Sequence, residues 1–335
     1  MSREATDARS APFSIFNSQL SISLRKQSWL FALLLLVVSG AIIYARQPNF
    51  FRPGVLRGNL GTALPLMLLA AGQAVVIIGG GVDLSVGAIV SLANVVLVRA
   101  LGAGDDPALV LPAFGLCVLA GALAGLVNGL CVAYARFQPI VTTFATSFIF
   151  AGLALYVLPS PGGSVPTEAM EAYSSSPLGL PLTIWVAALV LALWALLRAT
   201  RYGPYLYAVG GVQQAAYVSG VPVALVRLLT YVISGAMAAC GAAALVFATG
   251  TGSPLVGAPL ALSSVVAVVL GGNRLSGGQG GLLGPLLGVV VLLFIRALIS
   301  SLNIDTWYQT LVDGLIVMLA LAGPGIVALA RRGQN

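Results

Sequence analysis

Apolar runs long enough to cross a lipid bilayer follow one another along almost the whole chain. Of its 335 residues, 59% are hydrophobic and only 7% are charged, whereas a soluble domain carries roughly 25% charged residues. One membrane-spanning helix needs about 20 apolar residues, so the composition predicts an all-α, polytopic integral membrane protein. Hydropathy predicts ten spans, at 29–45, 60–79, 84–101, 109–134, 140–158, 181–197, 224–249, 259–272, 282–302 and 309–329.

The eighth span departs from this regular pattern. At 14 residues it is too short to cross a bilayer unaided, which predicts a broken or re-entrant helix near 259–280. Residues 1–28 are polar and are not followed by a small-residue cleavage site. We therefore expect a cytoplasmic N-terminal tail at 1–28 and a single transmembrane domain at 29–335.

The basic residues predict the orientation in the membrane, because they concentrate on the cytoplasmic side. With both termini cytoplasmic, the residues near cytoplasmic ends are Arg25, Lys26, Arg136, Arg198, Arg201, Arg227, Arg274, Arg331 and Arg332. Those near outer ends are Arg46, Arg52, Arg57 and Arg99. The carboxylates Asp105, Asp106, Glu168, Glu171 and Asp305 also fall outside. This orientation gives a long cytoplasmic loop at 198–223 and an extracytoplasmic loop at 159–180, expected to be an ordered loop or a cap.

Several chemistries are excluded by residue type. Histidine is absent, which removes imidazole catalysis and histidine metal ligation. Lys26 is the single lysine and does not follow a glycine-rich turn, so this sequence contains no P-loop. The three cysteines are isolated in apolar runs, as buried packing residues are. The basic residues are scattered singly, which argues against nucleic-acid binding. We expect no metal site and no cofactor bound by this chain.

A glycine-rich stretch, GGGVDLSVG at 79–87, contains the lone carboxylate Asp83. Asp83 and Ser85 are suited to cap the helix that follows. An ionisable group at membrane depth is also a candidate for a transport path or gate. The amides Gln73, Asn94 and Asn128 lie within spans, where they either line a hydrophilic path or bond neighbouring helices. Both interpretations stay open for all five residues.

Two further charges, Arg296 and Asp313, lie inside the last two spans. Their depths match, at roughly 9 Å and roughly 6 Å from the outer helix ends. Because a lone charge at such depth is expensive, we predict an Arg296–Asp313 ion pair between adjacent helices, with substrate contact as the alternative. Small residues recur at four-residue spacing in the fourth and seventh spans, which predicts close helix packing there.

Four stretches together resemble the permease subunit of ATP-binding-cassette importers of the ribose, or monosaccharide, type. They are PNFF at 48–51, VVIIGGGVDLSVG at 75–87, RYGPYLYAVGGVQQAAYVSGV at 201–221, and VVAVVLGGNRLSGGQGGLLGPLLG at 265–288 continuing to WYQTLVDGLIVMLA at 307–320. The resemblance covers almost the whole chain. Residues 275–279 also spell LSGGQ, which looks like the signature peptide of the ATPases of such systems, but its place between apolar segments favours coincidence.

The resemblance implies a permease that moves a small polar solute, most simply a monosaccharide, into a bacterial cell across the inner membrane. It implies a second permease subunit, two cytoplasmic ATPase subunits that hold ATP and magnesium, and a periplasmic sugar-binding protein. It assigns the 198–223 loop the role of coupling to the ATPase. The residues that match the coupling segment are Gly210, Gly211, Gln213, Ala215, Ala216, Ser219 and Gly220.

Two points stay open. Family members often carry Glu-Leu-Asp where this chain has Ala261-Leu262-Ser263, and an amide and a lysine at the places of Arg296 and Asp313. If any of these positions contacts the solute, the solute is not a typical pentose; alternatively, this chain is one half of a heterodimeric permease. An ion-coupled secondary transporter is the alternative, with Asp83 or the Arg296–Asp313 pair as the coupling site. An intramembrane enzyme would need clustered carboxylates or a nucleophile with a base, and the sequence offers neither.

Overall fold

The computed structural model describes residues 29–302, together with Asp305, Tyr308, Leu311, Val312, Gly314, Leu315 and Met318. Regular structure in the described residues is helical, apart from an isolated bridge between Gly162 and Gly252. The all-α prediction is therefore confirmed for this part of the chain. The tail at 1–28, most of the tenth predicted span and its Asp313 lie outside the described residues.

Nine apolar helices in the described residues coincide with the first nine predicted spans. They are α2 (Trp29–Arg46), α3 (Pro53–Ile78), α4 (Val86–Leu101), α5 (Val110–Ala133), α6 (Pro139–Val157), α8 (Leu182–Ala199), α11 (Val223–Thr249), α12 (Ala258–Leu270) and α13 (Leu283–Ser301). By length and composition seven of these can cross a membrane, while α4 and α12 are shorter. The shorter connecting helices are η1 (Pro48–Phe51), η2 (Pro107–Leu109), α7 (Thr167–Ser174), η3 (Pro177–Gly179), α9 (Tyr202–Gly211) and α10 (Gln213–Val218).

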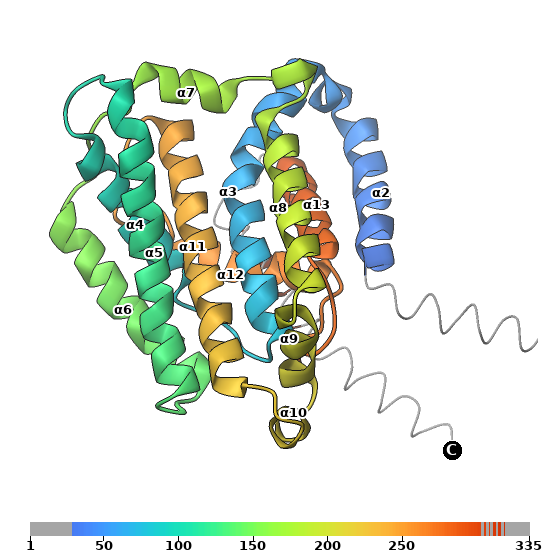
Figure 1. Ribbon diagram of the computed structural model, residues 1–335. Helices are drawn as coiled ribbons and strands as arrows, with labels where there is room; N and C mark the ends of the chain where they lie inside the picture. The colour runs from blue at the N-terminus through green and yellow to red at the C-terminus, as the bar shows by residue number, and fades with distance from the viewer. Residues whose placement is uncertain are drawn as a thin grey trace, which may run out of the picture.

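The long helices form a bundle with two distinct ends (Figure 1). Helix α7 lies across one end, and α10 projects from the other; we call these the α7 end and the α10 end. Helix α3 lies at the centre of the bundle, and 89% of an 18-residue apolar stretch of this helix is buried inside the protein. It contacts α8, α11, α12 and α13. A helix that is apolar on all sides is expected in such a position.

Helix α3 begins at Pro53, seven residues before the predicted start of its span at residue 60. Its first two turns contain Arg57 and Asn59, which lower the local hydropathy. These turns lie at the α7 end, where Arg57 is exposed. Pro53 is suited to the first turn of a helix because its missing N–H would have no helical partner there.

The predicted break around the eighth span lies on both sides of α12. This helix has 13 residues, about 20 Å of rise, against a hydrocarbon core about 30 Å thick. The residues before it are not helical, and side chains of α4 bind their backbone. Asn94 Oδ1 accepts the Ser253 N–H at 2.7 Å, and Ser91 Oγ accepts the Gly257 N–H at 3.0 Å.

Helices α3 and α12 end in the same way. In each, a glycine with positive φ, Gly80 at 79° and Gly272 at 81°, follows the last turn. The Gly81 N–H then bonds the Val76 carbonyl at 3.0 Å, and the Asn273 N–H bonds the Val268 carbonyl at 3.2 Å. This is the hydrogen-bond pattern of a Schellman motif, which satisfies carbonyls that a helix end leaves free. Both ends turn the chain sharply at the α10 end of the bundle.

The small residues of the fourth and seventh predicted spans lie against one another, because α5 packs on α11. A Cβ at Gly125 of α5 would meet the backbone carbonyl of Tyr231 in α11. A Cβ at Gly235 of α11 would likewise meet the carbonyl of Gly121. The two backbones therefore touch directly, as small-residue spacing in a membrane helix predicts.

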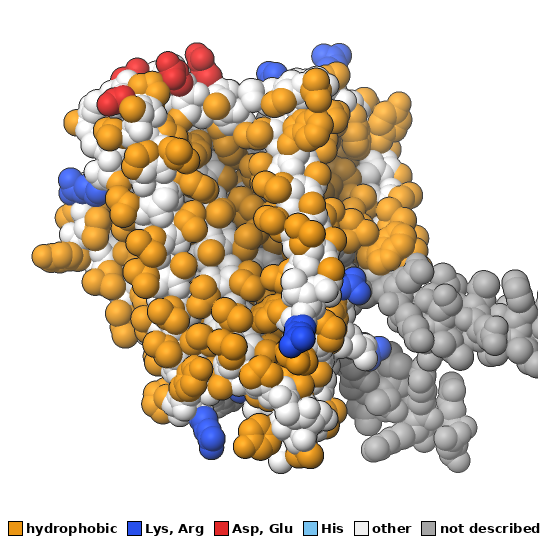
Figure 2. Space-filling view, in the orientation of Figure 1, with side chains coloured by type: hydrophobic (Ala, Val, Ile, Leu, Met, Phe, Trp, Pro, Cys, Tyr) orange, Lys and Arg blue, Asp and Glu red, His pale blue; other side chains and the backbone are white. Residues whose placement is uncertain are grey.

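On the face seen in Figure 2, hydrophobic side chains predominate along the bundle, and most of the charged side chains lie toward its ends. Large apolar residues on α2, α5, α6 and α8 are exposed, among them Val37, Leu111, Phe148 and Leu196, each at least 62% exposed. Such a surface is expected to face lipid, where every backbone polar group must be satisfied inside the protein.

The contact between α5 and α11 can be tested with two glycines of the same helix. We expect Gly125→Val to force α5 away from Tyr231 and to destabilise the protein by about 1–3 kcal/mol, a typical effect of overpacking. The matched control is Gly115→Val, because no described residue lies within 4 Å of a Cβ at Gly115. Melting temperatures of the detergent-purified proteins measure the difference, and equal losses for both variants would contradict the direct backbone contact.

Candidate functional site

The carboxyl group of Asp83 is the centre of a buried hydrogen-bond network between α3 and α4. Its Oδ1 accepts the Ser85 N–H at 2.9 Å and the Ser85 hydroxyl at 2.6 Å. Its Oδ2 accepts the hydroxyl of Ser234, from α11, at 3.1 Å. Asp83, Ser85 and Ser234 are all 0% exposed. Three donors thus satisfy the carboxyl group without any contact with solvent.

The network continues into α5, α6 and α3. The Asn128 amide donates to Ser85 Oγ at 2.7 Å, and Thr146 donates to Asn128 Oδ1 at 2.6 Å. Thr143 accepts the Leu84 N–H at 3.0 Å. With its amide oriented to satisfy both partners, Gln73 donates to the Asp83 carbonyl at 3.1 Å and accepts the Asp83 N–H at 3.2 Å. One network therefore ties four helices to the loop that precedes α4.

This arrangement relates directly to the capping role expected of Asp83 and Ser85. Helix α4 begins at Val86, and the Ser85 side chain makes no capping bond of its own. The bond from the Ser85 N–H to Asp83 places a carboxyl group at the helix N-terminus, where the helix dipole favours negative charge. Four of the five residues expected to line a path or gate, Gln73, Asp83, Ser85 and Asn128, meet here. Asn94 lies apart from them, against Ser253.

Three members of the network, Thr143, Thr146 and Ser234, were not singled out from the sequence. Thr143 and Thr146 are each next to another hydroxyl residue of α6, Thr142 and Ser147, and Ser234 lies between Ile233 and Gly235 in α11. The spacing of Thr143 and Thr146, three residues apart on one helix face, was the only signal that could have indicated a polar contact. Ser234 offered none, because its partner Asp83 is 151 residues away along the chain.

The segment expected to couple to an ATPase forms two short helices, α9 and α10, at the α10 end (Figure 1). Gly210 and Ala216 face inward and are buried, whereas Gly211, Gln213, Ala215, Ser219 and Gly220 are exposed. Exposed apolar side chains flank them, with Val212 at 64%, Tyr217 at 70% and Val218 at 77% exposure. The segment thus presents an apolar surface beyond the end of the bundle.

Glycines join this segment to two others that are distant in the sequence. A Cβ at Gly210 would meet the Ile78 carbonyl, at the end of α3, and the N–H of Gly278. The Gly278 N–H itself donates to the Ile78 carbonyl at 2.9 Å. We call this contact of residues 78–80, 210–211 and 277–278 the glycine junction. It contains the two glycines of the LSGGQ peptide, Gly277 and Gly278, which therefore have a packing role in this fold.

A tyrosine reinforces the glycine junction. The Tyr207 hydroxyl, on α9, donates to the Gly280 carbonyl at 2.7 Å. The Arg198 guanidinium lies 5.7 Å from the centre of the Tyr207 ring, within the range of a cation–π contact. Helix α9 is therefore held to the loop after α12 by both backbone and side-chain contacts.

Arg296, on α13, lies beside α12. Its Nη2 donates to Ser263 Oγ at 2.6 Å, so a hydroxyl binds the guanidinium at this depth. The ion pair with Asp313 stays a prediction, because Asp313 lies outside the described residues. Over the described part of the chain, no three His, Cys, Asp or Glu residues are grouped so as to hold a metal ion.

Two substitutions distinguish a hydrogen-bonding role of Asp83 from a need for its charge. We expect Asp83→Asn to keep the melting temperature near that of the wild type, because its oxygen still accepts from Ser85 and its amide can donate to Ser234. Asp83→Leu leaves the Ser85 and Ser234 donors without an acceptor, at about 1–3 kcal/mol for each buried group. Thermal unfolding in detergent measures both. A loss for the asparagine variant as large as for the leucine variant would show that the charge itself is required.

Residues 56–321 match the family model described as "Branched-chain amino acid transport system / permease component". The chain is 33% identical to the ribose import permease protein RbsC of Escherichia coli strain K12, over 89% of this chain and 93% of that protein. It is 32% identical to RbsC of Bacillus subtilis strain 168, over 84% of this chain and 87% of that protein.

A third relative is the galactose/methyl galactoside import permease protein MglC of Escherichia coli strain K12, 30% identical over 92% of this chain and 97% of that protein. No solved structure matches the chain. The family model covers most of the sequence, and each of these relatives aligns over nearly its full length. This chain therefore belongs to the family of permease components of transport systems that includes the ribose and galactose import permeases.

Proposed function

We propose that this chain is the membrane-spanning subunit of an ATP-driven importer for a monosaccharide. The observation that carries the proposal is its similarity to permeases named for the import of ribose and of galactose, over 89% and 92% of this chain, and to a D-allose transport system permease over 76% of it. The description of the family model names branched-chain amino acids, but these relatives are named for sugars. A neutral polyhydroxylated solute is therefore the favoured cargo.

The proposed energy source is an ATPase partner that binds at the α10 end. This sequence has one lysine, Lys26, and no P-loop. We therefore infer that a separate ATPase subunit, which holds ATP and magnesium, binds this chain on its cytoplasmic side. The exposed residues Val212, Tyr217 and Val218 around α10 form an apolar surface suited to its groove. Two ATPase subunits, a second permease subunit and a periplasmic sugar-binding protein complete the proposed assembly.

The glycine junction offers a route from the ATPase to the membrane interior. A movement of α9 and α10 would press directly on residues 78–80 and 277–278, because the backbones are in contact there. Residue 80 lies three residues before Asp83, whose network joins α3, α5, α6 and α11. Two-state movement of packed helices is the physical basis of alternating access, and this chain of contacts supports it.

The orientation is part of the same proposal. Arg136 and Arg227 line a pocket with residues of α10, and Arg201 precedes α9, whereas Glu168 lies on α7 and Asp105 bonds the start of that helix. Figure 2 shows acidic side chains gathered at the α7 end. Since basic residues favour the cytoplasmic side, we place the α10 end and both termini in the cytoplasm and the α7 end outside. We propose the bacterial inner membrane as the membrane in which this chain resides.

Uptake in membrane vesicles tests the energy source. We expect D-ribose, D-galactose or D-allose to accumulate only when the ATPase and ATP are present, because the Asp83 carboxyl group is closed to solvent and is poorly placed to bind a coupling ion. Accumulation driven by a proton or sodium gradient, without the ATPase, would instead identify an ion-coupled secondary transporter.

The coupling segment can be tested by one added charge. We expect Ala215→Glu, on the exposed side of α10, to abolish co-purification of the ATPase while the permease inserts and melts normally. The matched control is Ala172→Glu, on exposed α7 at the opposite end, which should keep the ATPase. Retention of the ATPase by both variants would place the docking surface elsewhere.

A further inference from the structure

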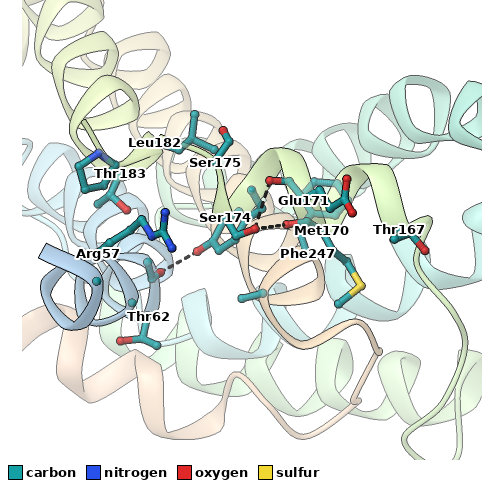
Figure 3. Close-up of a pocket in the computed structure, with 16 residues that line it drawn as sticks. Arg57, Thr62, Thr167, Met170, Glu171, Ser174, Ser175, Leu182, Thr183 and Phe247 are labelled. Carbon is teal, nitrogen blue, oxygen red and sulfur yellow. Dashed lines mark hydrogen bonds between the residues drawn. The ribbon is translucent and has the colours of Figure 1, made fainter. Parts of the chain in front are cut away.

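A cavity of about 540 Å³ lies beneath α7, at the opposite end from the coupling segment (Figure 3). Its walls come from the first turns of α3, from α7, from the start of α8 and from the end of α11. Ligand pockets in proteins usually have volumes of about 300–1,000 Å³. We call this space the α7 cavity. It is large enough for a monosaccharide together with bound water.

Two opposite charges line the α7 cavity, Arg57 from α3 and Glu171 from α7 (Figure 3). In the described part of the chain, neither side chain has a hydrogen bond or ion pair with another protein group. Their charges cancel, so the lining favours a ligand without net charge. Arg57 supplies five N–H donors, and the Glu171 carboxylate supplies acceptors.

Four hydroxyl groups of the lining share one hydrogen-bonding pattern, because each donates its proton to a backbone carbonyl. Thr62 donates its proton to the Asn59 carbonyl at 2.8 Å, Ser175 to the Ala172 carbonyl at 2.7 Å, and Thr183 to the Leu60 carbonyl at 3.1 Å. Ser174 donates to the Met170 carbonyl at 3.0 Å. Their oxygens keep free lone pairs, so they act toward a ligand as acceptors. A matching ligand must bring several O–H donors of its own.

The cavity also has an apolar side and a fixed roof. Phe247 and Met170 line it, and they suit the C–H faces of a sugar ring. Helix α7 is fixed over α3 because the Tyr173 hydroxyl donates to the Gly61 carbonyl at 2.6 Å. Burial raises the pKa of Tyr173 to about 12, so this donor keeps its proton at neutral pH. The Thr167 N–H, bonded to Asp105 at 2.8 Å, holds the start of the same helix.

We propose that the α7 cavity is the site at which the membrane subunit first binds its solute, a neutral monosaccharide. Arg57 donates to the sugar oxygens, while Glu171 and the hydroxyl oxygens of Thr62 and Ser175 accept from the sugar hydroxyls. This inference rests on the proposed function, because it places the cavity on the outer side of an importer. It adds a location and a set of contacts that the overall similarity to sugar permeases does not supply.

Thiol labelling in whole cells tests the site. In a chain whose three native cysteines are replaced with alanine, Ser174→Cys introduces a thiol into the cavity. The matched control, Ala172→Cys, lies on the same helix and outside the lining. We expect D-ribose, D-galactose or D-allose to slow the reaction of a membrane-impermeant maleimide with Cys at 174 several-fold and to leave position 172 unaffected.

The charged residues give a second readout in the same assay. In the Ser174→Cys chain, we expect Arg57→Gln or Glu171→Gln to raise the sugar concentration that gives half-protection about tenfold, the loss of one hydrogen bond to a charged group. Arg52→Gln and Glu168→Gln are the controls, since they lie at the same end and outside the lining. They should leave half-protection unchanged.

The outcomes separate this inference from the proposed function. Sugar uptake by the cells without protection at position 174 would overturn the site and leave the importer intact. Protection without uptake would support the site and contradict the transport assignment. Equal effects of the cavity variants and their controls would show that Arg57 and Glu171 do not contact the sugar, and would overturn the contacts proposed here.

Discussion

The fold depends on one constraint: a chain that interrupts its helices inside a membrane must satisfy the interrupted backbone from within the protein. Two non-helical segments of this chain meet the requirement with side-chain acceptors, one between α3 and α4 and one before α12. At the first break Asp83 and Thr143 accept the N–H groups of Ser85 and Leu84. At the second, Asn94 and Ser91 accept those of Ser253 and Gly257. Scarce polar side chains are concentrated where helical bonding stops.

This constraint explains which features could be predicted from the sequence. Continuous apolar runs mark helices, so the bounds of the first nine predicted spans agree with the structure to within a few residues. The exception is the start of α3, which was predicted too late because the first turns of this helix contain the polar residue Arg57. Gln73, Asp83, Ser85 and Asn128 stood out because amides and a carboxylate are rare in such runs. Ser234 did not, since a hydroxyl among apolar residues has almost no hydropathy signature and its partner is remote in the sequence.

The stretches GGVDLS at 80–85 and GGNRLS at 271–276 are similar in sequence. Part of this similarity has a local physical basis. In the structure the equivalent positions are shifted by one residue, because Gly80 corresponds to Gly272 as the left-handed residue after the helix. Both helix ends require the same turn, and glycine is the residue that adopts it readily. The paired glycines of the two stretches therefore follow from a shared way of ending a helix at the same end of the bundle.

The glycine junction has a mechanical consequence. Where two helices meet through side chains, a small displacement of one can be absorbed by rotamer changes in the other. At Gly210 and Gly278 main chain rests on main chain, and bond lengths and planar peptides yield very little. The contact therefore has no side-chain rotamers to absorb a displacement of α9, and we expect such a displacement to be passed to the end of α3 and to the loop after α12.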